Sequence, residues 1–89
     1  MSLESYLNHP TFGLLLLICP LGNGGDIFTT LYAHRLFFLV KESDRGMEFE
    51  PLGRDEARSL VDNQMRSLRR AGKMQDYKEV QETYRRTFQ

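Results

Sequence analysis

The chain has 89 residues, of which 40% are hydrophobic and 11% aromatic, so one small domain with a core is expected and global disorder is not. Its 12 basic and 12 acidic residues give a formal net charge of zero, which by itself indicates neither a nucleic-acid nor a membrane partner. A single cysteine, Cys19, excludes an internal disulfide and a cysteine-based zinc site. We expect it to be a small buried hydrophobe in a reducing cytoplasm.

Charge divides the chain near Gly53. Residues 1–53 contain 3 basic and 6 acidic residues, whereas residues 54–89 contain 9 basic and 6 acidic residues. The hydrophobic pattern changes at the same point, from a period of two to a period near 3.6. We therefore predict a β domain over residues 1–53 and a two-helix extension over residues 54–89.

The first part consists of short apolar or β-branched runs separated by the turn sequences NHPT, PLGNGGD and ESDRG. The predicted strands are Glu4–Leu7, Phe12–Cys19, Ile27–Tyr32, Arg35–Val40 and Met47–Pro51. Short, closely spaced strands are typical of a small antiparallel barrel or sandwich. The connection at Ala33–His34 lacks the Gly or Asn of a tight turn, so one long bent strand over Ile27–Val40 is an alternative.

The apolar run Phe12–Gly22 is the only candidate targeting segment. It is far shorter than the ~18–20 apolar residues that a membrane-spanning helix needs. Residues 1–11 contain no Lys or Arg, whereas a signal peptide begins with basic residues. We interpret the run as a buried strand and expect no membrane association.

Two amphipathic helices are predicted after Gly53, joined near Gly72 into a hairpin. Two i, i+4 ion pairs are expected to support them, Asp62 with Arg66 and Glu82 with Arg86. The apolar stripes consist of Ala57, Leu60, Val61, Met65 and Leu68 in the first helix and Met74, Tyr77, Val80, Gln81 and Tyr84 in the second. We expect these narrow stripes to pack on each other but not on the β domain, leaving the hairpin mobile relative to it.

Residues suited to catalysis are few. His9 precedes a proline in a turn, and His34 has no Cys, Ser or carboxylate at a motif spacing. The GNGG sequence at Gly22–Gly25 lacks the Lys-Ser/Thr of a phosphate-binding loop. We therefore predict that the protein is not an enzyme and binds neither a metal nor a cofactor.

A basic segment, RSLRRAGK, lies at the end of the first helix and contributes Arg66, Arg69, Arg70 and Lys73. These residues can complement the helix dipole as a solvated helix end, contact nucleic-acid phosphates, or bind an acidic protein. Arg69 and Arg70 are adjacent, so we expect them to point to different faces. A small nucleic-acid-binding protein that uses this segment is the alternative function.

Aromatic residues in a small barrel also raise the question of a methyl-lysine reader, which needs a cage of several rings. The rings available are Tyr6, Phe12, Tyr32, Phe37 and Phe38, with no Trp in the chain. Most of these rings are better explained as core.

The stretch LYAHRLFFLV at Leu31–Val40 has apolar residues on both faces of a strand. Alternation places Phe37 with Leu39 and places Leu36, Phe38 and Val40 on the other side. A single small barrel cannot bury both faces completely, so some of Leu36, Phe38 and Tyr32 should stay exposed beside Arg35. Tyr, Phe and Arg together are typical anchors of protein interfaces.

Four long strings, YLNHPTFGLL, LYAHRLFFLV, FEPLGRDEAR and LVDNQMRSLRR, closely resemble the PipX family, the cyanobacterial PII-interacting protein X. The resemblance extends over nearly the whole chain. It implies an α+β fold in which a five-stranded antiparallel Tudor-like (SH3-like) β-barrel precedes a C-terminal two-helix hairpin.

The same resemblance implies an adaptor that exchanges between two partners. When 2-oxoglutarate is scarce, the trimeric PII signalling protein holds it; when 2-oxoglutarate is abundant, it coactivates the dimeric transcription factor NtcA. The helices could reach RNA polymerase, and DNA would be reached only through NtcA. No direct small-molecule ligand is implied. The shared binding surface that the resemblance implies consists of Glu4, Tyr6, Tyr32, His34, Arg35, Leu36 and Phe38.

Overall fold

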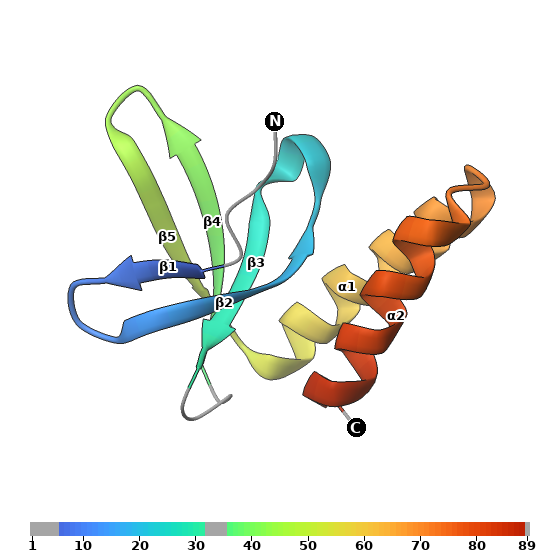
Figure 1. Ribbon diagram of the computed structural model, residues 1–89. Helices are drawn as coiled ribbons and strands as arrows, with labels where there is room; N and C mark the ends of the chain where they lie inside the picture. Colours follow the sequence, from blue (N-terminus) through green and yellow to red (C-terminus); the bar gives the residue numbers. More distant parts are fainter. Residues whose placement is uncertain (1–5, 32–35, 89) are drawn as a thin grey trace.

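The computed structural model describes residues 6–31 and 36–88. Five antiparallel strands follow one another in the sheet in the same order as in the sequence. They are β1 (Tyr6–His9), β2 (Gly13–Pro20), β3 (Asp26–Thr30), β4 (Phe37–Ser43) and β5 (Gly46–Leu52), with the short 3-10 helix η1 (Gly22–Gly24) before β3. Two helices, α1 (Arg54–Arg70) and α2 (Met74–Phe88), complete the chain. Figure 1 shows the sheet curled into a half-barrel with both helices on one side, which confirms the predicted α+β, Tudor-like class.

β3 and β4 form a hairpin. Thr29 pairs with Phe37 and Asp26 with Val40 in an antiparallel register, so the alternative of one long bent strand is wrong. The predicted connection at Ala33–His34 lies outside the described residues. β4 extends to Ser43 because its last residues continue to pair with β5.

Each face of the curled sheet has its own core. The core on the helix side consists of Ile18, Cys19, Ile27, Phe37, Leu52, Ala57, Val61, Val80 and Phe88. The core on the concave side consists of Leu15, Phe28, Phe38 and Val40, with Leu7, Leu17 and Phe49 packed against it. β4 contributes to both, because successive side chains of a strand point to opposite faces.

Local signals in the sequence account for the ends of α1. The backbone N–H of Gly53 donates to the Glu56 carboxylate over 3.2 Å, which helps to satisfy the free donors at the helix start. Gly72 adopts a φ of 75°, and the N–H of Lys73 then donates to the carbonyl of Leu68 over 3.0 Å. This left-handed stop separates α1 from α2. In the described part of the chain, no helix is both long and apolar enough to cross a membrane.

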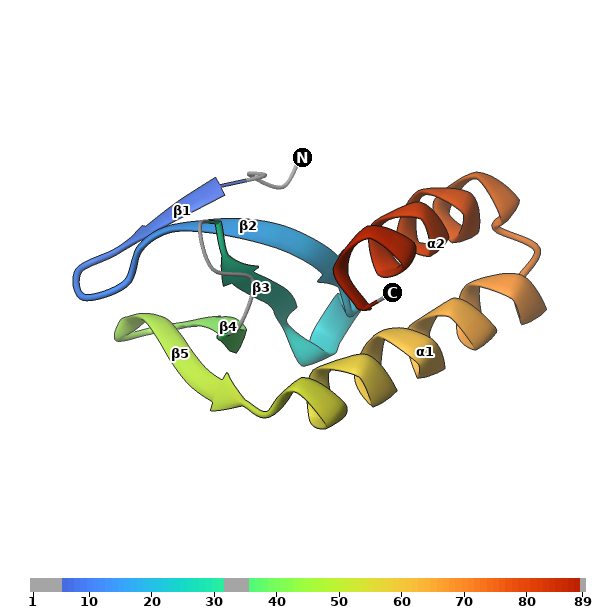
Figure 2. The ribbon, with the colours of Figure 1, turned by 90° about the horizontal axis from the view of Figure 1, so that it is seen from below.

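The expectation that the helices pack only on each other is wrong. Ala57 and Val61 of α1 are completely buried in the core that they share with the sheet. Phe88 of α2 stacks on Phe37 of β4, with ring centroids 5.4 Å apart and planes 18° from parallel. The predicted stripe of α2 ended at Tyr84 and so omitted this anchor. Figure 2 shows α1 and α2 side by side, with the C-terminal end of α2 close to the sheet.

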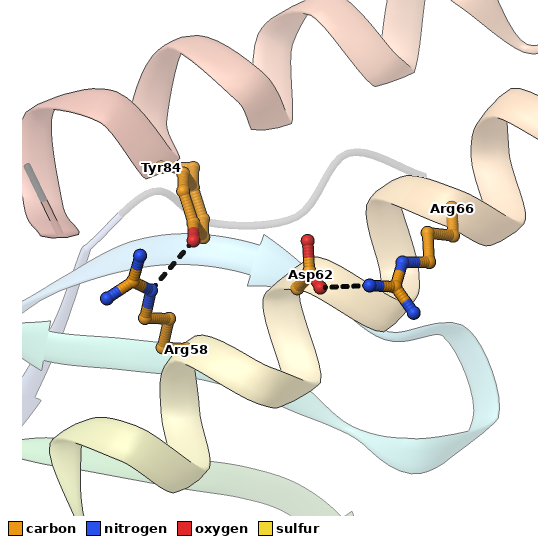
Figure 3. Close-up of polar contacts among 4 residues, drawn as sticks. All are labelled: Arg58, Asp62, Arg66 and Tyr84. Atoms are coloured by element: carbon orange, nitrogen blue, oxygen red, sulfur yellow. Dashed lines mark hydrogen bonds and ion pairs between the residues drawn. The ribbon is translucent and has the colours of Figure 1, made fainter.

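Polar contacts also join the two helices (Figure 3). Arg58 Nε donates to Tyr84 Oη over 2.8 Å, and the guanidinium carbon lies 5.8 Å from the centre of the same ring. At the end of α2, Arg54 donates to the carbonyl oxygen of Phe88 over 3.1 Å. These contacts hold the last turns of α2 beside the first turns of α1.

One of the two predicted ion pairs is present. Asp62 and Arg66 approach to 3.0 Å, as expected for an i, i+4 pair, and both side chains are substantially exposed (Figure 3). Glu82 and Arg86, both described, do not come within 4 Å of each other, so this prediction is wrong. Exposed side chains gain little from pairing, so their separation costs little.

We predict that Phe88→Ala lowers the free energy of unfolding by about 3–5 kcal/mol, because it leaves a cavity against Phe37 in a well-packed core. Met74→Ala on the same helix is the control, because Met74 is 46% exposed and its truncation should cost less than about 0.5 kcal/mol. Urea denaturation followed by circular dichroism measures both. Equal midpoints for the two variants would contradict a helix pair anchored to the sheet by Phe88.

Candidate partner-binding site

Immediately before β4 the chain exposes the apolar side chain of Leu36 to solvent. Phe37 and Phe38 are 1% and 4% exposed, each in one of the two cores, whereas Leu36 immediately before them is 43% exposed. The backbone there still follows the ladder, since the N–H of Thr30 donates to the carbonyl of Leu36 over 3.1 Å. The sequence predicted exposed apolar side chains at this point, and Leu36 confirms it.

The structure describes three of the seven predicted surface residues. Leu36 immediately precedes β4 and lies two positions from Phe38, so strand alternation places the two on the same side of the sheet. Tyr6 is 50% exposed on β1, where it pairs with Leu16. Through the register of the sheet its row includes Phe37, so Tyr6 lies on the opposite face from Phe38. Glu4, Tyr32, His34 and Arg35 lie outside the described residues.

Phe38 is buried by aromatic neighbours on the concave side, so it cannot itself be an exposed anchor. Its ring lies 5.4 Å from that of Phe12, 5.6 Å from that of His9 and 6.4 Å from that of Phe49. Phe12, in contrast, is 44% exposed. The β1–β2 turn thus covers Phe38 and presents Phe12 in its place.

His9 builds this turn. Its Nδ1 accepts hydrogen bonds from the backbone N–H groups of Thr11 and Phe12, at 3.0 and 3.2 Å. Its ring also meets Phe49 edge to face at 4.9 Å. Sequence analysis found no role for His9, although its place before a proline in a turn was the available signal. The four rings are packed on one another, an arrangement unlike the open cage of a methyl-lysine reader.

The basic segment is divided by the fold. Arg66, Arg69 and Arg70 line one hollow of about 370 Å³ at the end of α1. Lys73 instead lines a hollow between β2 and the helices, together with Asp76 of α2. Arg69 and Arg70 both line the first hollow, although adjacent residues of a helix cannot share one exact face.

The described residues hold no group of three or more His, Cys, Asp or Glu side chains that could bind a metal ion. What the described surface presents is exposed apolar side chains on the β domain and three arginines at the end of α1. Such groups can bind a macromolecule by contact and charge.

The family model described as PipX, PII-interacting protein X, matches residues 3–88, nearly the whole chain. The chain belongs to the PipX family. No curated protein matches it. The match includes both the half-barrel and the helix pair, so all seven predicted surface residues lie within it.

Cys19 is chemically shielded in this fold. It is fully buried in the core on the helix side, and its Sγ lies 3.4 Å from the carbonyl oxygen of Pro20. Burial, with a smaller contribution from the negative charge of Asp26, raises the pKa of the Cys19 thiol to about 12. Burial also raises the pKa of Asp26. Because the thiolate is the reactive form, Cys19 in the folded protein presents almost no nucleophilic thiolate near neutral pH.

We predict that Cys19 does not react with iodoacetamide at pH 8 in the folded protein but reacts readily in urea. Since the thiol pKa is raised in the folded state, Cys19 contributes stability that is complete below its unfolded pKa and is lost as the pH rises toward about 12. Mass spectrometry after timed alkylation measures the reactivity. Rapid labelling at a rate independent of urea would contradict the burial.

Proposed function

We propose that this chain is a non-catalytic regulatory adaptor with two mutually exclusive protein partners, PII and NtcA. The match to the PII-interacting protein X family over residues 3–88 carries the proposal. The exposed Leu36 at the start of β4 supports it, because an apolar side chain in solvent is a ready contact for a protein partner. The residues proposed for both partners are Glu4, Tyr6, Tyr32, His34, Arg35, Leu36 and Phe38, of which Phe38 is buried and can act only as support beneath the contact surface.

One surface used by two partners makes their binding competitive. At low 2-oxoglutarate the PII trimer binds the adaptor and lowers its free concentration by mass action. At high 2-oxoglutarate PII releases it, and it binds the NtcA dimer. Coactivation then requires that the adaptor prefer the active form of NtcA, since a ligand shifts an equilibrium only by its difference in affinity for the two states.

In this scheme the 2-oxoglutarate sensor resides in the partners, and the chain itself binds no small molecule. DNA is reached only through NtcA, and the place of action is the cytoplasm. The helix pair lies on the side of the sheet opposite to the concave core, so it is free to contact a further protein while the β domain is engaged. RNA polymerase is the further partner that we propose for it.

We predict that Tyr32→Ala and Arg35→Ala each weaken binding to both PII and NtcA by about tenfold or more, because truncated Tyr and Arg anchors typically cost this much. Met74→Ala is the matched control, since Met74 is exposed on α2 away from the β domain. Calorimetric titration gives the affinities, with PII and ATP at low 2-oxoglutarate and with NtcA at high 2-oxoglutarate. Circular dichroism verifies the fold.

The shared surface is tested further by adding NtcA to the preformed PII complex. Rising 2-oxoglutarate should transfer the adaptor from one partner to the other. A stable complex containing both partners on one adaptor molecule would overturn mutual exclusion, and so would a variant that loses only one of the two affinities.

The hollow lined by three arginines favours direct nucleic-acid binding as the second candidate function. In that case a gel shift with the isolated protein should reveal tight binding that weakens steeply as salt rises. Charge reversal by Arg69→Glu with Arg70→Glu should abolish it. Under the adaptor proposal, we expect no shift at physiological salt and unchanged PII affinity for the same double variant.

A further inference from the structure

The carbonyl oxygen of Leu36 accepts two hydrogen bonds from β3. One comes from the backbone N–H of Thr30, over 3.1 Å, and continues the sheet ladder. The other comes from the hydroxyl of Thr29, over 2.8 Å. The ladder bond already satisfies this oxygen, so the hydroxyl is not needed to rescue an unpaired acceptor. Its effect is to fix the carbonyl, and with it the peptide that follows Leu36, from a second direction.

Thr29 makes this contact from inside the core on the helix side. It is completely buried and pairs with Phe37, the residue that receives Phe88 of α2. The hydrogen bond therefore joins the rigid interior to Leu36, whose own side chain is 43% exposed. Thr29, which no partner can touch, thus helps to fix the backbone at Leu36, whose side chain a partner can touch.

The next residue provides an internal comparison. Thr30 is also buried, at 6% exposure, but its hydroxyl has no hydrogen-bond partner among the described residues. In a buried strand position valine has nearly the shape of threonine and does not carry a hydroxyl to satisfy. The two adjacent hydroxyls thus differ: that of Thr29 donates to the Leu36 carbonyl, whereas that of Thr30, on the other face of the strand, makes no hydrogen bond to the described residues.

The other end of the same connection is also held. The N–H of Leu31 donates to the carbonyl of Leu14 on β2 over 3.1 Å. Leu31 and Leu36 therefore leave the sheet from defined positions, and the predicted contact residues Tyr32, His34 and Arg35 lie between them in the sequence.

We propose that Thr29 is a positioning residue for partner binding, which acts through its hydrogen bond to the Leu36 carbonyl and never touches the partner. This inference rests on the adaptor function proposed above. Because the bond sets the geometry of the surface before any partner arrives, its removal affects both partners alike. Substitution of a contact residue differs in its effect, because the affinity lost then depends on the groups of each partner that touch that residue.

Three conservative variants separate this role from a purely structural one. Thr29→Val keeps the shape and removes the hydroxyl, whereas Thr29→Ser keeps the hydroxyl and removes a buried methyl group. Thr30→Val removes the hydroxyl that has no partner. Calorimetric affinities for PII and for NtcA are compared with thermal melting, and the carbonyl carbon-13 chemical shift of Leu36 reports the hydrogen bond directly.

We expect partner affinity to fall when the hydroxyl of Thr29 is removed, and the melting temperature to fall when its methyl group is removed. Thr29→Val should bind both partners about fivefold more weakly, because binding must then fix a carbonyl that the hydroxyl no longer holds, and the Leu36 carbonyl resonance should shift. Thr29→Ser should bind within about twofold of the unchanged protein despite a lower melting temperature, because it loses packing but not the bond. Thr30→Val should keep full affinity and melt no lower.

Full affinity of Thr29→Val for both partners would overturn the inference, and so would affinities that follow the melting temperatures across the three variants. Failure of the unchanged protein to bind either partner is a different result, since it overturns the adaptor function before any variant is compared.

Discussion

The alternation of Phe37 and Phe38 is the constraint on which the rest of this small protein depends. One ring stacks on Phe88 of α2, and the next lies among the rings of the concave side. A single strand thereby contributes to both cores. In a chain of 89 residues, where the buried fraction of the surface is low, losing either core would remove much of the available stabilisation.

This double burial decides where apolar side chains can remain exposed. Within β4 the rings of Phe37 and Phe38 are buried in the two cores. Exposed apolar side chains therefore occur beside the ends of this strand and in the turn that covers the concave side. Leu36 and Phe12 are at such places, and both are more than 40% exposed. The helices cannot seal Leu36, because they cover the opposite face of the sheet. The exposed surface is thus a consequence of how the half-barrel is closed.

Much of this was predictable from sequence because the signals were local. The change of period near Gly53, the turn sequences and the glycine at position 72 were sufficient for the number and order of elements. Two features depended on distant residues and were missed: the docking of the helices through Phe88, and the cover that His9 and Phe12 place over Phe38. Neither contact can be predicted from the hydrophobic periodicity of the sequence. Each depends on which side of the sheet is reached by a segment that is distant in the sequence. The sequence indicated only that some of Leu36, Phe38 and Tyr32 stay exposed, and the structure exposes Leu36 and buries Phe38 for this reason.

The same geometry separates the exposed apolar residues of the β domain from the packed helix pair. The exposed side chains of Phe12 and Leu36 are available to a partner while the helices remain packed on the helix-side core, so binding there does not sterically require release of the helices. Charge is divided in the same way, with the acidic excess in residues 1–53 and the basic excess in residues 54–89. Under the proposed adaptor function, two large partners that share the exposed apolar residues of the β domain must compete for them. The proposed exchange then needs no moving part in this chain, only a change in the affinity of one partner.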